Sequence, residues 1–337
     1  MKHPSVVQKN DSTLDLTLRP DRWHAYIGQE KIKHNLQILI EAAKKRKEPI
    51  EHVLLYGPAG LGKTTLAYLI AKEMGVSIKT TSGPAIEKAG DLAAILTNIG
   101  EGNVLFIDEV HRMHKVVEEI LYPAMESSVL DIILGKGPSA KTIQLQLPRF
   151  TIIAATTRAG LLSAPFRSRF GTTHRLDFYQ ENEMKEIIRR SALLLNATLE
   201  EGGLEKIARA SRATPRVANR ILKRVRDYAQ VHNISPITEE ATEKALALMD
   251  IDAIGLETTD RRILKTIITK YNGGPVGLKT IAASTSEEIE TIEDIYEPYL
   301  LQIGFLSRSH QGRIATQYAY EHLGIPYHHR QKQGKLL

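Results

Sequence analysis

One glycine-rich segment, GPAGLGKT at residues 57–64, constrains the fold of this chain more than any other feature. It satisfies the pattern G-x-x-x-x-G-K-[ST], directly after an apolar run at 53–56 and before a helical pattern at 65–73. Glycines let the backbone curl so that N–H groups and a helix N-terminus face phosphates, while Lys63 reaches the terminal phosphates and the Thr64 hydroxyl binds Mg²⁺. The sequence therefore predicts a phosphate-binding loop between a strand and a helix.

Two adjacent carboxylates, Asp108 and Glu109, end the apolar run VLFI at 104–107. In a P-loop ATPase one such carboxylate holds the Mg²⁺ shell and the other polarises the attacking water. Simple capping of a strand end is the alternative interpretation. Because Lys63 is already in place 45 residues upstream, the pair favours hydrolysis over nucleotide binding alone.

Two weaker signals follow along the chain. Thr156 and Thr157 come after the apolar run 150–155, where a hydroxyl can bond to a γ-phosphate or to the lytic water, although an ordinary strand-terminal threonine has the same sequence. Arg169 and a second arginine lie on a predicted turn between two phenylalanines. From such a turn an arginine could stabilise charge on a neighbouring subunit's phosphates, and a surface salt bridge is the alternative.

Short apolar runs alternate with helical patterns up to about residue 180, which predicts an α/β fold with a parallel, doubly wound sheet. The segment 129–147 interrupts this alternation. Its apolar residues alternate with others on both sides of the turn 135–138, which predicts a projecting β-hairpin. Four amphipathic helices are predicted next, between residues 181 and 249.

The last part of the chain has its own pattern. Helices are predicted over 258–270, around 278–283 and over 286–303, followed by a strand–turn–strand over 305–316, which together outline a winged helix. The predicted domains are a tail at 1–17, a P-loop domain at 18–180, a small helical domain at 181–255, a winged helix at 256–330 and a tail at 331–337.

Composition narrows the classes of function. The absence of cysteine excludes disulfides, thiolate zinc sites, iron–sulfur clusters and cysteine nucleophiles, and it fits a reducing compartment. No N-terminal apolar region and no long apolar stretch is present, so we expect a cytoplasmic protein without a membrane partner. A net charge of +6 and a pI near 9.2 are consistent with nucleic acid binding.

Charge is distributed unevenly in the predicted winged helix. Between residues 286 and 303 there is no Lys or Arg, and the six carboxylates are Glu287, Glu288, Glu290, Glu293, Asp294 and Glu297. Carboxylates without balancing cations would repel DNA phosphates. We therefore expect the DNA contact to come from the wing, where Arg308 and Arg313 can contact phosphates irrespective of base sequence.

These features, in this order, resemble the AAA+ ATPases, with a P-loop sheet domain, a small helical lid and a C-terminal winged helix. Residues 18–330 are more closely similar to the RuvB family of Holliday junction branch-migration motors. The segments that carry the resemblance are LRP at 18–20, YIGQ at 26–29, TSGPAIEK at 81–88, LYPAME at 121–126 and GGPVGL at 273–278.

The resemblance implies a homohexameric ring that hydrolyses ATP to ADP with Mg²⁺ and moves duplex DNA at Holliday junctions. It implies a role in homologous recombination, DNA repair and the SOS response. The partners it implies are RuvA, which would dock on the hairpin 129–147, and the RuvC resolvase.

The resemblance also implies individual residue roles. The nucleotide-binding residues are Leu18, Arg19, Tyr26, Ile27, Gly60, Gly62, Lys63, Thr64, Thr65, Glu126, Ser127, Ser128, Tyr179 and Arg216. Lys63, Glu109, Thr157 and Arg169 would act in catalysis, with Thr157 as the first sensor and Arg169 as the finger inserted into the next subunit. Arg216 would be the second sensor, and Thr64 and Asp108 would hold the metal.

Three places depart from the pattern of the family. Ser127-Ser128 stand where an acidic and an aromatic residue are usual, Ala213 replaces a glycine, and Gln311 replaces the central cation of the wing. Two other functions stay open from the residues themselves. One is an ATP-dependent loader or remodeller of a protein partner, and the other is a nucleotide-gated DNA-binding regulator.

Overall fold

The computed structural model describes residues 17–134 and 141–327. The chain divides into two compact units, the first formed by residues up to 197 together with 213–220, and the second by 198–212 and the residues from 221 onward. Apart from Thr17, the predicted tails at 1–17 and 331–337 lie outside the described residues, as does the predicted turn 135–138. Among the described helices, none combines the length and apolar character needed to cross a bilayer.

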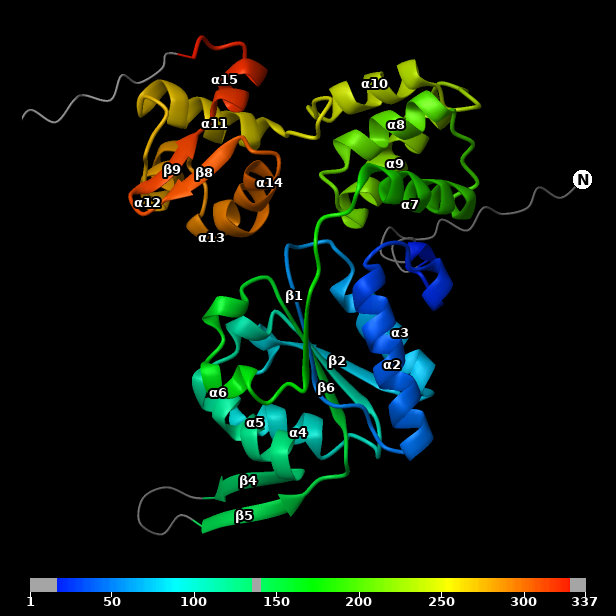
Figure 1. Ribbon diagram of the computed structural model, residues 1–337, viewed down its shortest axis with the longest axis vertical. Helices are drawn as coiled ribbons and strands as arrows, with labels where there is room; N and C mark the ends of the chain where they lie inside the picture. The colour runs from blue at the N-terminus through cyan, green and yellow to red at the C-terminus, as the bar shows by residue number, and fades with distance from the viewer. Residues whose placement is uncertain (1–16, 135–140, 328–337) are drawn as a thin grey trace, which may run out of the picture. The chain divides into compact units, whose positions relative to one another are not determined.

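A five-stranded parallel sheet forms the centre of the first unit, in the order β2-β3-β6-β1-β7 (Figure 1). Its strands are β1 (Val53–Tyr56), β2 (Ile78–Ser82), β3 (Val104–Asp108), β6 (Thr151–Thr156) and β7 (Thr172–Arg175). The three inner strands are almost entirely buried, as expected of a parallel sheet covered on both faces. The predicted doubly wound α/β fold is confirmed.

Helices cover both faces of this sheet. In Figure 1, α2 (Glu30–Arg46) and α3 (Lys63–Met74) lie on one side, and α4 (Ala89–Leu96) and α5 (Lys115–Ser127) lie on the other. The second face is closed by a continuous apolar cluster, in which leucines of α4 and α5 pack with alternate residues of β3 and β6. The remaining helices of this unit are η1 (Trp23–Ala25), η2 (Gly83–Ala85), η3 (Val110–Arg112), η5 (Ala159–Leu161), α6 (Ala164–Arg167) and α7 (Glu181–Leu194).

A β-hairpin projects from the sheet domain directly after α5 (Figure 1). Its strands β4 (Val129–Leu134) and β5 (Lys141–Gln146) pair antiparallel, with Leu130 opposite Leu145. At its base the Leu147 N–H donates to the Ser128 carbonyl oxygen over 2.7 Å. The predicted hairpin is thereby confirmed.

The second unit contains helices followed by a winged helix. The helices are α8 (Glu201–Ala210), the greater part of α9 (Pro215–Val231) and α10 (Glu239–Leu248). The winged helix comprises α11 (Thr258–Lys270), α12 (Leu278–Thr285), α13 (Ile289–Thr291), η6 (Ile292–Tyr296), α14 (Glu297–Gln302), β8 (Leu306–Ser309), β9 (Gly312–Ala315) and α15 (Gln317–His322). A separate apolar cluster joins α11, α12, α14 and the two wing strands.

The helix predicted over 286–303 is found over 289–302, with a later start and a π-helical segment in its middle. Ser286 ends α12 in a left-handed conformation with φ of 56°, so the next helical turn begins only at Ile289. That helix then widens into the π-helical segment η6 before α14. Pro298 has no N–H for an ordinary helical hydrogen bond, which accounts for the widened turn before it.

Candidate active site and wing

The glycine-rich loop connects β1 to the first turn of α3. Gly57, Gly60 and Gly62 have φ values of 138°, 82° and 98°, which residues with a Cβ rarely adopt. A Cβ at Gly57 would also lie 2.4 Å from the Leu176 carbonyl oxygen, and one at Gly62 would lie 2.8 Å from the Tyr26 hydroxyl. Both the backbone conformation and the close packing therefore require glycine.

Lys63 lies inside this curled loop. Its ammonium donates to the Gly57 and Pro58 carbonyl oxygens, each over 2.8 Å, and only 7% of the residue is exposed. Burial lowers the pKa of Lys63 to about 8, although the nearby Asp108 carboxylate acts in the opposite direction. The two carbonyl oxygens are acceptors that phosphate oxygens could replace.

The two carboxylates at the end of β3 face different partners. Asp108 accepts hydrogen bonds from the Glu109 N–H at 2.9 Å and from the Thr64 hydroxyl at 3.4 Å. Glu109 has a left-handed backbone with φ of 47°, and its half-exposed carboxylate accepts from Arg112 over 3.2 Å. Thr64 and Asp108 thus bring together two oxygen ligands of the kind Mg²⁺ prefers, while the Glu109 carboxylate remains accessible.

Thr156 and Thr157, at the end of β6, have different surroundings. Thr156 is buried, its hydroxyl lies 2.9 Å from His111 Nδ1, and it accepts from the Arg158 N–H over 3.0 Å. Thr157 is half-buried, and within the described ranges its hydroxyl has no hydrogen-bond partner. Because β1, β3 and β6 are parallel neighbours, Thr157 lies at the same edge of the sheet as the glycine-rich loop and Glu109. Thr156 is structural here, and Thr157 is the hydroxyl available for chemistry.

Two tyrosines and a lid residue pack on the loop from outside. The Tyr26 and Tyr179 hydroxyls both donate to the Leu61 carbonyl oxygen, over 3.3 Å and 3.2 Å. Burial raises the pKa of Tyr179 to about 12, so this hydroxyl keeps its proton. The Arg216 N–H donates to the Gly60 carbonyl oxygen over 3.4 Å. These three predicted nucleotide contacts are therefore brought to the loop.

The N-terminal segment is anchored to α3 and α7. Arg190 on α7 donates to the carbonyl oxygens of Leu18 and Arg19, over 2.9 Å and 3.3 Å. The Arg19 guanidinium lies 5.9 Å from the centre of the Tyr68 ring on α3. Two further predicted nucleotide-binding residues belong to this region. Ile27 is half-buried next to Tyr26 in sequence, and Thr65 is buried in α3.

Arg169 lies on the turn after α6, and its described partners belong to α5 and α6. Its guanidinium pairs with Glu126 over 3.0 Å and lies 4.1 Å from the centre of the Tyr122 ring. Glu126, Ser127 and Ser128 stand at the end of α5, where the hairpin begins. Within the described part of the chain, no hydrogen bond or ion pair joins these three predicted nucleotide contacts to the glycine-rich loop.

The wing arginines share one buried carboxylate. Glu297 is fully buried, and each of its oxygens accepts one hydrogen bond from Arg308 and one from Arg313, at 2.7–3.1 Å. Burial opposes ionisation of Glu297, but these hydrogen bonds outweigh it and hold its pKa below the ordinary value. The side chain of Arg308 remains 52% exposed, whereas that of Arg313 is only 18% exposed.

The prediction that the carboxylates of 286–303 lack balancing cations is therefore wrong for at least two of them. Glu297 is paired with both wing arginines, and Glu287 is paired with Arg262 of α11. The balancing cations come from elements distant in sequence, which the local charge count could not include.

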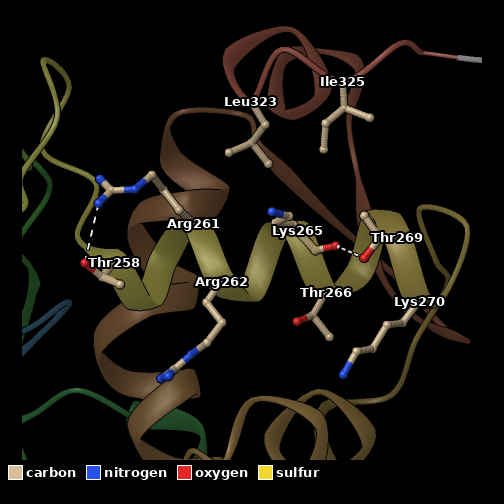
Figure 2. Close-up of a pocket in the computed structure, with 9 residues that line it drawn as sticks. All are labelled: Thr258, Arg261, Arg262, Lys265, Thr266, Thr269, Lys270, Leu323 and Ile325. Carbon is tan, nitrogen blue, oxygen red and sulfur yellow. Dashed lines mark hydrogen bonds between the residues drawn. The ribbon is translucent and has the colours of Figure 1, made fainter.

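A basic groove of about 560 Å³ runs along α11 of the winged helix (Figure 2). The segment that follows α15 lines its other side. The cations of the groove are Arg261, Arg262, Lys265 and Lys270, and Leu323 and Ile325 form its apolar wall. Arg261 and Arg262 are engaged by Asp252 and Glu287. Lys265 and Lys270 are exposed, and their ammonium groups have no partner among the described residues.

Three family models match consecutive parts of the chain. The Holliday junction DNA helicase RuvB P-loop domain matches residues 18–176, the RuvB AAA lid domain matches 179–252, and the RuvB C-terminal winged helix domain matches 253–324. The chain belongs to the RuvB family. RuvB membership confirms the AAA+ architecture, nucleotide binding and the classification as a branch-migration helicase and ATP hydrolase.

Solved structures of a RuvB protein show the same fold. The Thermotoga maritima RuvB Holliday junction branch migration motor is 49% identical, with a TM-score of 0.86 over 93% of this chain and 100% of that one. A point mutant of the same RuvB is also 49% identical, with a TM-score of 0.87 over 92% and 100% of the two chains.

Proposed function

We propose that this RuvB-family chain assembles into a hexameric ring that hydrolyses ATP to move duplex DNA through Holliday junctions, with RuvA docked on β4–β5 and RuvC as a further partner. The observation that carries the proposal is that Lys63, Glu109 and Thr157 lie at the same edge of the parallel sheet. Arg169 supports the ring, because the partners of its guanidinium belong to α5 and α6 and not to its own glycine-rich loop, which suits a role toward a neighbouring subunit's phosphates.

We infer the following division of roles. Lys63 and the loop N–H groups bind the β- and γ-phosphates of ATP, and Glu109 accepts a proton from the water that attacks the γ-phosphorus as the bond to the bridging oxygen breaks. Thr157 orients this water, and Arg169 of the next subunit stabilises the charge that develops. Thr64 and Asp108 would hold Mg²⁺, which when bound neutralises phosphate charge.

Assembly is tested by mass photometry of the full chain with ATP and a duplex of about 40 base pairs. We expect particles containing six 37.6-kDa chains, and omission of nucleotide is expected to reduce their number. Persistence of single chains at micromolar concentration with both ligands present would contradict the ring.

The pKa of Lys63 predicts a pH dependence of ATP binding. Because this pKa is about 8, Lys63 is charged below that pH and neutral above it. Phosphates bind the charged form, so we expect the Kd for ATP to be nearly constant from pH 7 to 7.5 and then to rise by up to about tenfold per pH unit above 8. Equilibrium titration with a fluorescent, non-hydrolysable ATP analogue measures this.

Lys72 provides the matched control, because it lies on the same helix with an exposed ammonium. Lys72→Gln is expected to reproduce the wild-type pH curve. A Kd that stays level up to pH 9.5 in the wild type would show that Lys63 keeps its charge, contrary to the prediction.

We infer that the wing contacts DNA phosphates, chiefly through Arg308. Arg308→Ala is expected to weaken duplex binding about equally for all base sequences and to reduce the slope of log K against log salt by about 1. Fluorescence anisotropy with two duplexes of unrelated sequence, at several salt concentrations, measures both effects.

The α11 groove supplies a control in the same domain. The double variant Lys265→Gln, Lys270→Gln removes two exposed charges and is expected to lower DNA affinity less than Arg308→Ala does. A larger loss in the groove variant would place the phosphate contact on α11, and a loss confined to one duplex would contradict sequence-independent binding.

A further inference from the structure

The Arg169 guanidinium is held on three sides. Its face stacks 4.1 Å from the centre of the Tyr122 ring, Nη1 donates to the Pro165 carbonyl oxygen over 2.6 Å, and Nη2 pairs with Glu126 over 3.0 Å. Only 18% of the side chain is exposed, an unusually low fraction for an arginine outside a core. These three residues, Tyr122, Pro165 and Glu126, form what we call the arginine seat.

Tyr122 is itself fixed. Its hydroxyl donates to the buried Glu118 carboxylate over 2.8 Å and lies 3.1 Å from the Ser163 hydroxyl. Ser163 also bonds to Glu118, and it caps α6 by accepting from the Phe166 N–H over 3.2 Å. The Tyr122 ring is therefore tied both to its own helix α5 and to the start of the segment that carries Arg169.

We propose that Tyr122 is a positioning residue for Arg169, which it holds ready for the nucleotide of a neighbouring subunit. The inference rests on the proposed role of Arg169. Stacking uses the face of the guanidinium and therefore occupies none of its in-plane N–H groups. A free arginine samples many rotamers, whereas a stacked one loses less freedom when it binds.

The three members of the seat differ in how readily they can be exchanged. The Glu126 side chain is 57% exposed, so a phosphate oxygen can replace its carboxylate on Nη2. The Tyr122 ring and the Pro165 carbonyl oxygen belong to packed elements and stay in place. Arg169 can therefore change its anionic partner without leaving the Tyr122 ring.

The first test compares steady-state ATP hydrolysis by the full chain carrying Tyr122→Leu or Tyr122→Phe. Tyr122→Leu removes the stacking surface, and we expect kcat to fall about 10- to 30-fold with KM for ATP changed less than twofold. Tyr122→Phe keeps the ring and is expected to stay within about threefold of the wild-type kcat. Equal activity of Tyr122→Leu and the wild type would overturn the proposal.

Mixed rings separate a defect in presenting Arg169 from a defect in folding. A Lys63→Ala subunit cannot bind ATP productively, but it offers an intact Arg169 to its neighbour. Mixing it with Tyr122→Leu is therefore expected to restore hydrolysis several-fold above the sum of the two variants alone. Thermal unfolding of Tyr122→Leu beside the wild type checks that the subunit folds.

Arg169→Ala mixed with Lys63→Ala is the reference. Rescue of Arg169→Ala without rescue of Tyr122→Leu would refute the positioning role of Tyr122 and leave the proposed function intact. Failure to rescue Arg169→Ala would refute the action of Arg169 on a neighbouring subunit, and the Tyr122 proposal with it.

Discussion

Replacing Glu109 with glutamine is expected to lower kcat for ATP hydrolysis by about 10²- to 10⁴-fold, because the amide cannot accept a proton from water. Glutamine has the same shape and can keep the left-handed backbone at this position. The Kd for ATP is expected to stay within about threefold of the wild type, since in the proposed mechanism Lys63 and the loop make the phosphate contacts. Phosphate release under saturating ATP and equilibrium nucleotide titration measure the two quantities.

Glu119 provides the matched control, because it is an exposed glutamate on α5. Glu119→Gln is expected to leave kcat unchanged. If Glu109→Gln kept its activity, or if it lost nucleotide binding instead of turnover, Glu109 would not be the base.

Replacing Glu297 with alanine is expected to lower the free energy of unfolding of the winged helix by about 3–5 kcal/mol. The variant leaves Arg313 mostly buried without its carboxylate, whereas the half-exposed Arg308 can turn to solvent. The transition of the winged helix in the full chain is followed by calorimetry. Glu288→Ala is the control, because Glu288 is exposed in the same segment, and we expect it to change stability by less than about 0.5 kcal/mol.

The lowered pKa of Glu297 gives this prediction a second readout. A carboxylate whose pKa is lower in the folded state adds stability above its unfolded-state pKa, and this stability is lost as pH falls through the folded-state value. Glu297→Ala should therefore flatten the acid side of the stability curve. The shared carboxylate would contribute little to stability if Glu288→Ala and Glu297→Ala lost similar free energies of unfolding. An acid side of the stability curve that Glu297→Ala left unchanged would show the same.

The sheet domain was largely predictable from sequence, because its inner strands are short apolar runs and its loop needs glycines at fixed spacing. Strand β7 was not predicted, since its residues Thr172–Arg175 are mostly polar and it pairs with β1 on one side only. Edge strands lack the apolar pattern that marks strands buried on both faces.

The candidate site, like the sheet domain, could be predicted only in part from the sequence. Lys63, Asp108 and Glu109 follow from a local motif, and the resemblance to the family indicated Thr157. The physical reason that separates Thr157 from Thr156 is the contact of Thr156 with His111, which lies 45 residues away in sequence. The sequence around Tyr122 and Glu297 does not indicate their partners, because these are Arg169, Arg308 and Arg313 on other elements of the fold. A tyrosine or glutamate beside the apolar residues of a helix resembles an ordinary surface residue in sequence.

As a branch-migration motor, this chain converts ATP hydrolysis into movement of branched DNA. The most direct measurement is dissociation of a synthetic four-way junction with homologous arms, followed with labelled strands, with and without RuvA. We predict ATP-dependent conversion to duplex products by the wild type, strongest with RuvA, and none by Glu109→Gln. Absence of ATP-dependent movement in both conditions, from a protein that still hydrolyses ATP, would contradict the motor and favour a loader or remodeller of a protein partner.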